Sequence, residues 1–341
     1  MRLYILLLLC LFYLCCEDLN KDPNTIIFTK VFGGNDKETG YSVQQTADNG
    51  YIITGNTLSF GNGNYDSWVV KTDSKGKEEW NRSYGGSLED QTFDGRQTTD
   101  GGYIFCGRVG SFGNGRADVW LIKTDFQGNE EWNRIFGEND IEYGFSVQQT
   151  TDGGYIVSGE TKSFGNGHLD FWLIKTDYQG HEEWNKTFGG ENMDRGYSVL
   201  QTEDGGYIIC GQTLSFGDHY SSGYLVKTDS DGNEEWNRVL GGSGFGRTIQ
   251  QTEDGGYIIA GSIYSNENNS QDVWLIKTDS QGTEEWNKTY GGIEWEYGHF
   301  VSQTTDGGYI ITGSTESYGN GEKDMLLIKT DSEGNTNPFE D

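Results

Sequence analysis

The sequence repeats itself with a period of about 52 residues, and this repeat restricts the fold more than any other feature. The tripeptide Lys-Thr-Asp marks six copies, separated by 52, 52, 52, 50 and 52 residues. It occurs at 71–73, 123–125, 175–177, 227–229, 277–279 and 329–331. A repeat of this length is one supersecondary unit that cannot bury its apolar face alone. The chain therefore predicts a stack or ring of six equivalent units.

Each copy contains four segments of strand length. In the first copy these are YSVQQT, GYIITG, DSWVVKTD and EEWNRSYGG, at 41–46, 50–55, 66–73 and 78–86. They are rich in β-branched and aromatic residues and are bounded by Gly, Asp or Asn, which is typical of strands. In most copies Thr-x-Asp-Gly-Gly joins the first two segments and Asp-x-x-Gly joins the last two. Both sequences predict tight hairpins.

The third segment is apolar on both of its faces. In DVWLIKTD at 118–125, Val119 and Leu121 alternate with Trp120 and Ile122. Alternate side chains of a strand point to opposite faces, so this strand must be covered on both sides. The fourth segment begins with two Glu residues and suits an outer strand. The whole unit has about the size of a propeller blade.

The two ends of the chain complement each other. TIIFTKVFGG at 25–34 has the pattern of a fourth segment, and Phe28 lies 52 residues before Trp80, while the sixth copy ends after its third segment. Closing a ring removes exposed sheet edges, which would explain the orphan segment. We predict an all-β, six-bladed propeller of four-stranded antiparallel blades over 25–335, in which the N-terminal strand completes the C-terminal blade. Residues 336–341 form a tail, and a β-helix or an open array is the alternative.

The repeat unit GGYI-x-x-G…D-x-W-L-I-K-T-D-x-x-G-x-x-x-W…GG resembles the repeats of secreted bacterial β-propeller proteins. Many of these are uncharacterised, and some carry transferred enzyme names such as endoglucanase. The resemblance implies the fold and export but no particular activity. The D-x-x-G-x-x-x-W part also resembles the tryptophan-docking repeat of quinoprotein propellers and the sialidase Asp-box. The spacing from Asp to Gly differs by one residue from each, so neither activity carries over.

The first 16 residues are predicted to be a signal peptide. Leu3 to Cys16 is an apolar run of 14 residues, which is too short to span a bilayer and typical of a signal-peptide core. The run ends in Leu-Cys-Cys-Glu-Asp and resembles a bacterial lipoprotein signal, which would place a lipid on Cys16, with Cys15 as the second choice. An ordinary signal peptide cut nearby is the alternative. We expect an exported outer-membrane or cell-surface lipoprotein with a short linker at 17–24.

The chain is strongly acidic, with 53 Asp and Glu residues against 24 Lys and Arg residues and a net charge of −29. Such a surface repels nucleic acids and anionic lipid headgroups. It either keeps an exported protein soluble or attracts cations or a basic partner. Cys106 and Cys210 share one repeat position that holds small residues in other copies, so we expect inert buried thiols and no disulfide. We expect a monomer without a cofactor, in contact with the membrane only through its lipid.

Candidate binding residues come from loops that differ between copies. The short hairpins fall on one face of a propeller, and the longer loops after the second and fourth segments fall on the other, where function usually resides. Departures from the repeat near these loops suit a sugar or another polar ligand, because Trp stacks on sugars and carboxylates or Arg bond hydroxyls. The alternative is that loops drift where packing does not constrain them. The candidates are Asp94, Arg96, Glu142, Arg195, Arg247, Glu294, Trp295, Glu296 and His299.

No catalytic motif is visible in the sequence. His-x-x-x-His, Cys-x-x-Cys and Gly-x-Ser-x-Gly do not occur, and the four His residues lie apart. We therefore predict no metal site and no catalytic residue. A pair among the many acids could serve a glycosidase. The expected function is a non-catalytic binding or interaction scaffold, with a glycan or a surface protein as partner; a glycan-active hydrolase or carbohydrate-binding protein is the alternative.

Overall fold

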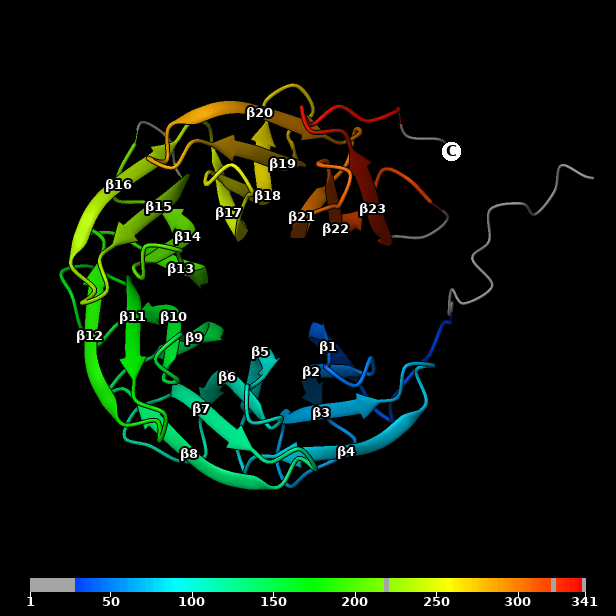
Figure 1. The fold of residues 1–341 in the computed structure, drawn as a ribbon, viewed down its shortest axis with the longest axis vertical. Coiled ribbons are helices and arrows are strands. Elements are labelled where there is room, and N and C mark those ends of the chain that lie inside the picture. Colours follow the sequence, from blue (N-terminus) through cyan, green and yellow to red (C-terminus); the bar gives the residue numbers. More distant parts are fainter. Residues whose placement is uncertain (1–27, 218–220, 320–322, 339–341) are drawn as a thin grey trace, which may run out of the picture.

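The computed structural model describes residues 28–217, 221–319 and 323–338, and in these residues it contains 23 β-strands and no helix. The strands form six antiparallel sheets arranged around a central channel (Figure 1). The prediction of an all-β, six-bladed propeller is confirmed. None of the described residues forms a helix that could cross a membrane. The predicted leader and lipid attachment at Cys16 lie outside the described residues.

The first three blades each have four strands in sequence order. Blade 1 contains β1 (Glu38–Gln45), β2 (Tyr51–Thr57), β3 (Asp66–Thr72) and β4 (Glu78–Tyr84). Blade 2 contains β5 (Asp90–Gln97), β6 (Tyr103–Val109), β7 (Asp118–Thr124) and β8 (Glu130–Phe136). Blade 3 contains β9 (Glu142–Gln149), β10 (Tyr155–Thr161), β11 (Asp170–Thr176) and β12 (Glu182–Phe188).

Blades 4 and 5 repeat this arrangement, and blade 6 has three strands in the described part of the chain. Blade 4 contains β13 (Asp194–Gln201), β14 (Tyr207–Thr213), β15 (Ser222–Thr228) and β16 (Glu234–Leu240). Blade 5 contains β17 (Gly244–Gln251), β18 (Tyr257–Ser265), β19 (Ser270–Thr278) and β20 (Glu284–Tyr290). Blade 6 contains β21 (Glu296–Gln303), β22 (Tyr309–Thr315) and β23 (Asp324–Thr330).

The first strand of each blade lies next to the channel and the fourth strand lies at the periphery (Figure 1). Both predicted hairpins form. In blade 3, Gly153 has a φ of 88° and donates its N–H to Thr150, while Gly180 has a φ of 77° and donates its N–H to Asp177. Gly adopts such a φ without strain, which explains why all copies keep Gly at the second turn and all but the first keep it at the first turn, where Asn49 has a φ of 65°.

The core lies between the blades. One cluster joins Ile104 and Leu121 of blade 2 to Val147, Val157 and Trp172 of blade 3, all of them buried. Strands β3, β7, β11 and β15 are buried along their whole length. The third segment is therefore covered on both faces, as its sequence predicts. Cys106 and Cys210 are free and buried in these interfaces, as predicted, and burial raises the pKa of both thiols.

A buried lysine ties the two hairpins of each complete blade together. In blade 3, Nζ of Lys175 lies 2.9 Å from the Asp152 carboxylate and 2.8 Å from that of Glu183, and it donates to the carbonyl oxygen of Thr176 at 2.9 Å. The lysine side chain is only 3% exposed. Because all three donors of the ammonium group have oxygen partners, the Lys-Thr-Asp tripeptide can place a charge inside the blade.

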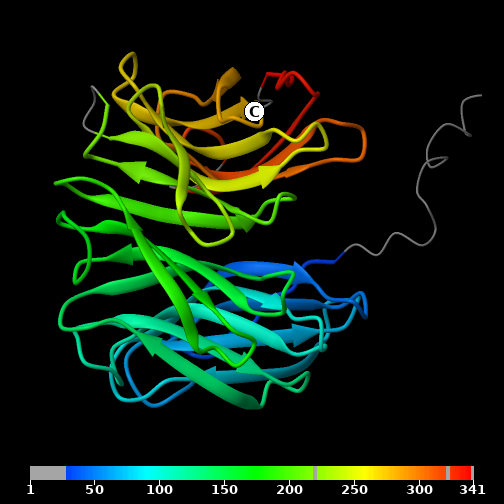
Figure 2. The same cartoon turned by 60° about the vertical axis from the view of Figure 1, so that its left-hand side comes forward.

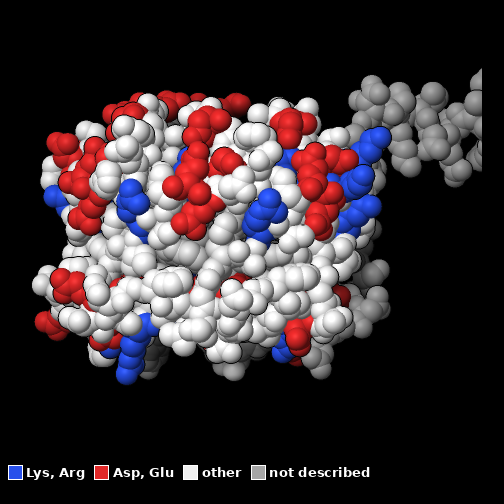
Figure 3. Space-filling view, turned by 90° about the horizontal axis from the view of Figure 1, so that it is seen from below, with Lys and Arg blue, Asp and Glu red and all other residues white. Residues whose placement is uncertain are grey.

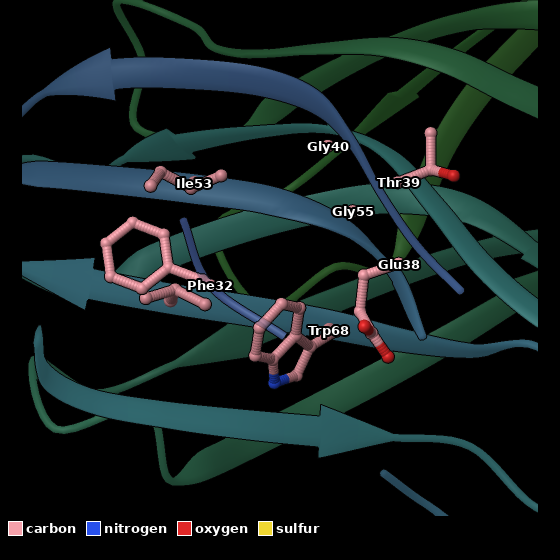
Figure 4. A pocket seen from close by; sticks show the side chains of 8 residues that line it. Phe32, Glu38, Thr39, Gly40, Ile53, Gly55 and Trp68 are labelled. Atoms are coloured by element: carbon pink, nitrogen blue, oxygen red, sulfur yellow. The ribbon is translucent and has the colours of Figure 1, made fainter. Parts of the chain in front are cut away.

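The N-terminal segment packs on blade 1 in phase with the repeat. The ring of Phe28 lies 5.7 Å from that of Tyr51, as Trp132 lies 5.8 Å from Tyr155 two blades later. Phe32 lines a pocket with Ile53 and Trp68 (Figure 4). Phe28 and Phe32 thus stand on blade 1 where the fourth strand of a preceding blade would place its own side chains.

Closure of the ring by this segment is not confirmed. Residues 28–34 form no strand, and the sheet of blade 6 ends at β23 among the described residues. Second strands pack on the next first strand from blade 1 to blade 6, but β22 has no such interface with β1. Figures 1 and 2 show the opening between them. Met325 is 90% exposed and Leu327 66% exposed at this seam, whereas Val119 and Leu121 of blade 2 are buried.

Charged side chains are unevenly distributed on the outside of the ring. On the side shown in Figure 3, most acidic and basic side chains gather toward one rim, and the other half is largely uncharged. The peripheral fourth strands contribute to this pattern, because each begins with two exposed Glu residues. Such charges disfavour edge pairing with other sheets.

Candidate functional site

An aromatic belt surrounds the channel. The fourth residue of each of the first four inner strands is aromatic, and the rings contact one another from blade to blade. The centroid distances are 5.4 Å for Tyr41 and Phe93, 5.7 Å for Phe93 and Phe145, and 5.5 Å for Phe145 and Tyr197. Such spacing is favourable for aromatic pairs. All four side chains remain partly or largely exposed, so their surfaces are available from the channel. We call Tyr41, Phe93, Phe145, Tyr197, Arg247 and His299 the channel belt.

Blades 5 and 6 replace the aromatic residue of the belt with basic side chains. The Arg247 guanidinium lies over the ring of Tyr197 at 5.5 Å, a cation–π arrangement. His299 is solvent-accessible at its surface, but surrounding protein atoms and the nearby charges of Arg247 and Lys323 lower its pKa. Arg247 and Lys323 therefore make one sector of the channel positively charged in a chain whose net charge is −29.

Three rings are stacked along the inner strand of blade 6. Trp295, Tyr297 and His299 alternate along the chain and therefore share one face of the strand. The rings of Trp295 and Tyr297 lie 6.1 Å apart at an angle of 19°, and those of Tyr297 and His299 lie 6.4 Å apart at 6°. Nζ of Lys323 lies 4.7 Å from the centre of the Tyr297 ring. This ladder leads from the loop after β20 into the channel.

Polar groups of blades 2 to 4 interlock above the belt. Arg108 donates to the hydroxyl of Tyr143 at 2.8 Å and also contacts Glu89. Nε of Arg195 lies 2.7 Å from Oε2 of the buried Glu160. Burial raises the pKa of the Glu160 carboxyl, and the charge of Arg195 offsets part of this rise. Arg195 and Glu160 are close enough for an ion pair that offsets the buried charge, although these two atoms do not have the geometry of a hydrogen bond.

The predicted residues of blade 2 lie in the channel wall. Asp94 is buried and accepts hydrogen bonds from Ser42 at 2.9 Å, Val147 N at 3.1 Å and Ser146 at 3.4 Å. Its carboxylate thus bridges blades 1 to 3 and has little capacity left for a ligand. Arg96 is more exposed, and its Nε lies 3.4 Å from the Asp94 carboxylate.

Two predicted acids serve the loops instead of the channel. Glu142 and Glu296 are fully buried at the start of their strands. Glu142 accepts from Ser163 N at 2.9 Å, and Glu296 accepts from Gly292 N at 2.8 Å and Thr315 Oγ1 at 2.7 Å. Because these bonds hold both side chains at the loops, we leave both residues out of the proposed ligand surface in the channel. Glu294, in contrast, is exposed in its loop.

The structure brings part of the predicted set together. Arg247 and His299 are neighbours in the basic sector, and Trp295 is connected to them through the ring of Tyr297. Arg195 joins the same side through Tyr197, whose pKa its charge lowers against the larger effect of burial. Asp94 and Arg96 lie on blade 2, apart from this group.

Sequence reasoning missed several residues of the channel wall. Tyr143 faces Glu160 and Arg195 faces Gln212 in the register between first and second strands. The signal was present, because the second-strand position after the Gly shared by all copies varies more than its neighbours. It holds Asn56, Arg108, Glu160, Gln212, Ser262 and Ser314. Tyr297 was missed for a different reason, since stacking with its neighbours depends on the twist of the strand.

The described residues contain no group of three or more His, Cys, Asp or Glu side chains placed to hold a metal ion together. The channel belt itself holds no carboxylate. Its chemistry is that of aromatic faces and cationic groups, which bind planar, sugar or anionic groups.

No family model matches the chain, and no curated protein matches it by sequence. A solved structure of a protein of unknown function from Dyadobacter fermentans has a TM-score of 0.54 at 12% identity, covering 87% of this chain and 96% of that one. A protein of unknown function from Bacteroides caccae has a TM-score of 0.49 at 12% identity, over 81% and 90% of the two chains. The extracellular domain of a one-component system from B. thetaiotaomicron gives 0.47 at 10%, over 90% and 37%. The first of these likenesses supports the propeller fold and nothing finer.

Proposed function

We propose that this protein is an exported, lipid-anchored surface propeller that binds a ligand at the channel mouth on the variable-loop face and does not transform it. The leader ending at Cys16 supports the location. The scaffold supports binding, because rigid blades hold loops and inner strands whose residues differ from copy to copy.

The asymmetry of the channel belt carries the proposal. Six equivalent positions would hold six similar residues if packing alone decided them. Four are aromatic, while Arg247 and His299 occupy the other two and stand beside Lys323. A preformed apolar surface with a few convergent polar groups is the usual form of a ligand site.

An acidic saccharide is the ligand class that this surface fits best. The ladder of Trp295, Tyr297 and His299 offers parallel faces on which sugar rings can stack. Arg247 and Lys323 can pair with a carboxylate or sulfate group through charge-assisted hydrogen bonds. The remaining surface of the protein is acidic, so this basic sector would orient such a ligand.

A glycoside hydrolase is the less favoured alternative. That reaction needs two carboxyl groups that flank the scissile bond. The loop acids Glu142 and Glu296 bind backbone amides, and Glu160 is buried against Arg195. Among these three, none presents a free carboxyl group to the channel.

Binding of the purified protein to an array of acidic and neutral glycans tests the proposal. We expect acidic glycans to bind, Arg247→Ala to weaken binding at least about tenfold through loss of a charge-assisted contact, and Trp295→Ala to weaken it through loss of stacking. Phe126→Ala is the matched control, because Phe126 is exposed on a hairpin of the opposite face. Binding that is equal in Arg247→Ala and the control would refute the channel mouth as the site.

The lipid anchor is tested separately by cell fractionation. Cys16→Ser should release the protein from the membrane fraction, and Cys15→Ser should leave it there. If both variants fractionate like the parent chain, the lipid is not on either residue.

A further inference from the structure

Pairs of buried carboxylates recur where one blade meets the next, outside the channel. The third strand of one blade begins with Asp, and the first strand of the following blade begins with Asp or Glu. In the first three of these interfaces both side chains are buried. The pairs are Asp66 with Asp90, Asp118 with Glu142, Asp170 with Asp194, and Asp272 with Glu296.

Each pair contains a carboxylate oxygen without a hydrogen-bond donor. In the interface of blades 2 and 3, Oδ2 of Asp118 accepts from Asn114 N at 3.0 Å, but Oδ1 has no partner. The unpartnered oxygens are Asp66 Oδ1, Asp118 Oδ1, Asp194 Oδ1 and Asp272 Oδ1. A buried anionic oxygen without a partner is costly. Three of the four oxygens belong to an Asp of a third strand, and the fourth, Asp194 Oδ1, belongs to the first strand on the other side of the same kind of interface, so these places suit a positively charged ligand.

Other oxygen atoms converge on the same place. A Cβ added to Gly115 would lie 2.5 Å from the carbonyl oxygen of Asp140, 2.7 Å from that of Glu138 and 3.3 Å from Oδ1 of Asp118. A side chain at this position would collide with these oxygens, so glycine allows the loop before the third strand to approach the loop after the fourth strand closely. The free carboxylate oxygen and the two backbone carbonyl oxygens therefore lie around one point at Gly115.

The second carboxylate of the pair lies close to the same unpartnered oxygen. A Cβ added to Gly137 would lie 2.1 Å from Oδ1 of Asp118 and 2.7 Å from Oε2 of Glu142. Burial raises the pKa of Asp118, backbone amides lower it, and the charge of Glu142 raises it again. Two anionic groups thus approach each other in a buried place without a cation among the described side chains there.

The interface of blades 3 and 4 repeats this geometry. A Cβ added to Gly167 would lie 2.3 Å from the carbonyl oxygen of Gly190 and 2.5 Å from that of Asn192. A Cβ added to Gly189 would lie 2.2 Å from Asp170 Oδ1 and 2.6 Å from Asp194 Oδ2. The oxygen cage is thus a property of the repeat.

We propose that these four blade interfaces bind calcium ions, each held by the two carboxylates and by carbonyl oxygens of the loop that follows the fourth strand. Ca²⁺ takes six to eight oxygen ligands from carboxylates and backbone carbonyls at roughly 2.3–2.6 Å. Two carboxylates neutralise its charge. The ion would clamp one blade to the next at the rim that carries the variable loops.

The interface of blades 4 and 5 is a natural control within the chain. Ser222 and Gly244 take the places of the two acids there, so that interface has no carboxylate pair. It also belongs to the copy whose spacing is 50 instead of 52 residues. Two blades can therefore pack at this rim without a carboxylate pair. Packing alone thus does not explain the acid pairs at the other four interfaces.

The experiment measures calcium binding and thermal unfolding of the purified protein after treatment with EGTA and desalting. We expect about four Ca²⁺ per chain by calorimetric titration, one for each pair. Addition of millimolar CaCl₂ should raise Tm by at least about 5 °C, because a ligand that binds only the native state stabilises it. Mg²⁺ should act more weakly, because it prefers a smaller octahedral site.

Two variants locate the ions. Asp118→Asn should lower the stoichiometry by one, and Ser222→Ala, at the interface without the pair, should leave it unchanged. If calcium neither binds nor raises Tm in the parent protein, the proposal is wrong and each pair shares a proton instead. If Asp118→Asn binds as many ions as the parent, the calcium lies elsewhere on the acidic surface. The titration of the parent protein decides the matter even if Asp118→Asn fails to fold.

Discussion

Lys175 shows how one residue of the repeat stabilises a blade from inside. Replacing it with Met should lower the free energy of unfolding by about 2 kcal/mol, because buried hydrogen bonds of an ammonium group to two carboxylates and a carbonyl are lost. Lys162→Met is the control, since Lys162 pairs with Asp140 on the surface and such pairs contribute little. Urea unfolding measures both. Equal small losses would show that the buried ammonium does not stabilise the blade.

Asp152, the partner of Lys175, makes the stability of the folded protein depend on pH. Partial burial opposes the shift, but hydrogen bonds from Thr150, Lys175 and Gly154 lower the pKa of Asp152 to about 2. A carboxyl group with a lowered pKa in the folded state stabilises the protein above its unfolded pKa of about 4, and this contribution is lost as pH falls toward 2.

Asp152→Asn should therefore reduce the loss of stability between about pH 4 and pH 2. Thermal unfolding at a series of pH values measures this loss. Glu203→Gln, which changes an exposed acid of a neighbouring hairpin, is the control and should follow the parent curve. A parent-like acid profile in Asp152→Asn would contradict the assigned role of Asp152.

At the scale of the element, the N-terminal segment stabilises blade 1 through the side chain of Phe32. Phe32→Ala should destabilise the protein by about 1–2 kcal/mol, because its partly buried ring fills the pocket beside Ile53 and Trp68. Phe126→Ala should change stability by less than about 0.5 kcal/mol, since Phe126 is 65% exposed. Denaturant unfolding compares them. A Phe32→Ala variant as stable as the control would mean that the segment leaves blade 1 in solution.

Strands and hairpins could be predicted from the sequence, because turn residues such as Gly153 and Gly180 have a local cause that each copy repeats. The phase of Phe28 was predictable for the same reason. The pairing of 25–34 with β23 was not confirmed, since phase does not set hydrogen bonds between distant segments. The burial of Glu142 and Glu296 was not predicted, because an acid that binds backbone amides looks in sequence like one that faces water.

At the scale of the whole molecule, the six similar blades differ in one place, the seam between blade 6 and blade 1. The first strand of blade 1, β1, and the second strand of blade 6, β22, lack the packing interface that joins each other pair of adjacent blades. The channel belt passes from Tyr41 to His299 across the other five interfaces, so the basic sector lies next to the opening. The proposed ligand site thus lies next to the seam. A ligand bound by blade 6 would contact a blade that lacks one of its two packing interfaces with neighbouring blades.

Hydrogen exchange measured by mass spectrometry tests the state of this seam in solution. Backbone amides exchange through local openings, which are easiest where apolar contacts are few. We expect β23 and β1 to exchange at least about tenfold faster than their counterparts β7 and β9, because Met325 is 90% exposed while Val119 and Val147 are buried. Protection that is equal in all six blades would show that the ring closes in solution and that residues 25–34 complete the last blade. Deletion of 25–34 would then raise exchange in β23, whereas in an open ring it would leave β23 unchanged and affect blade 1 alone.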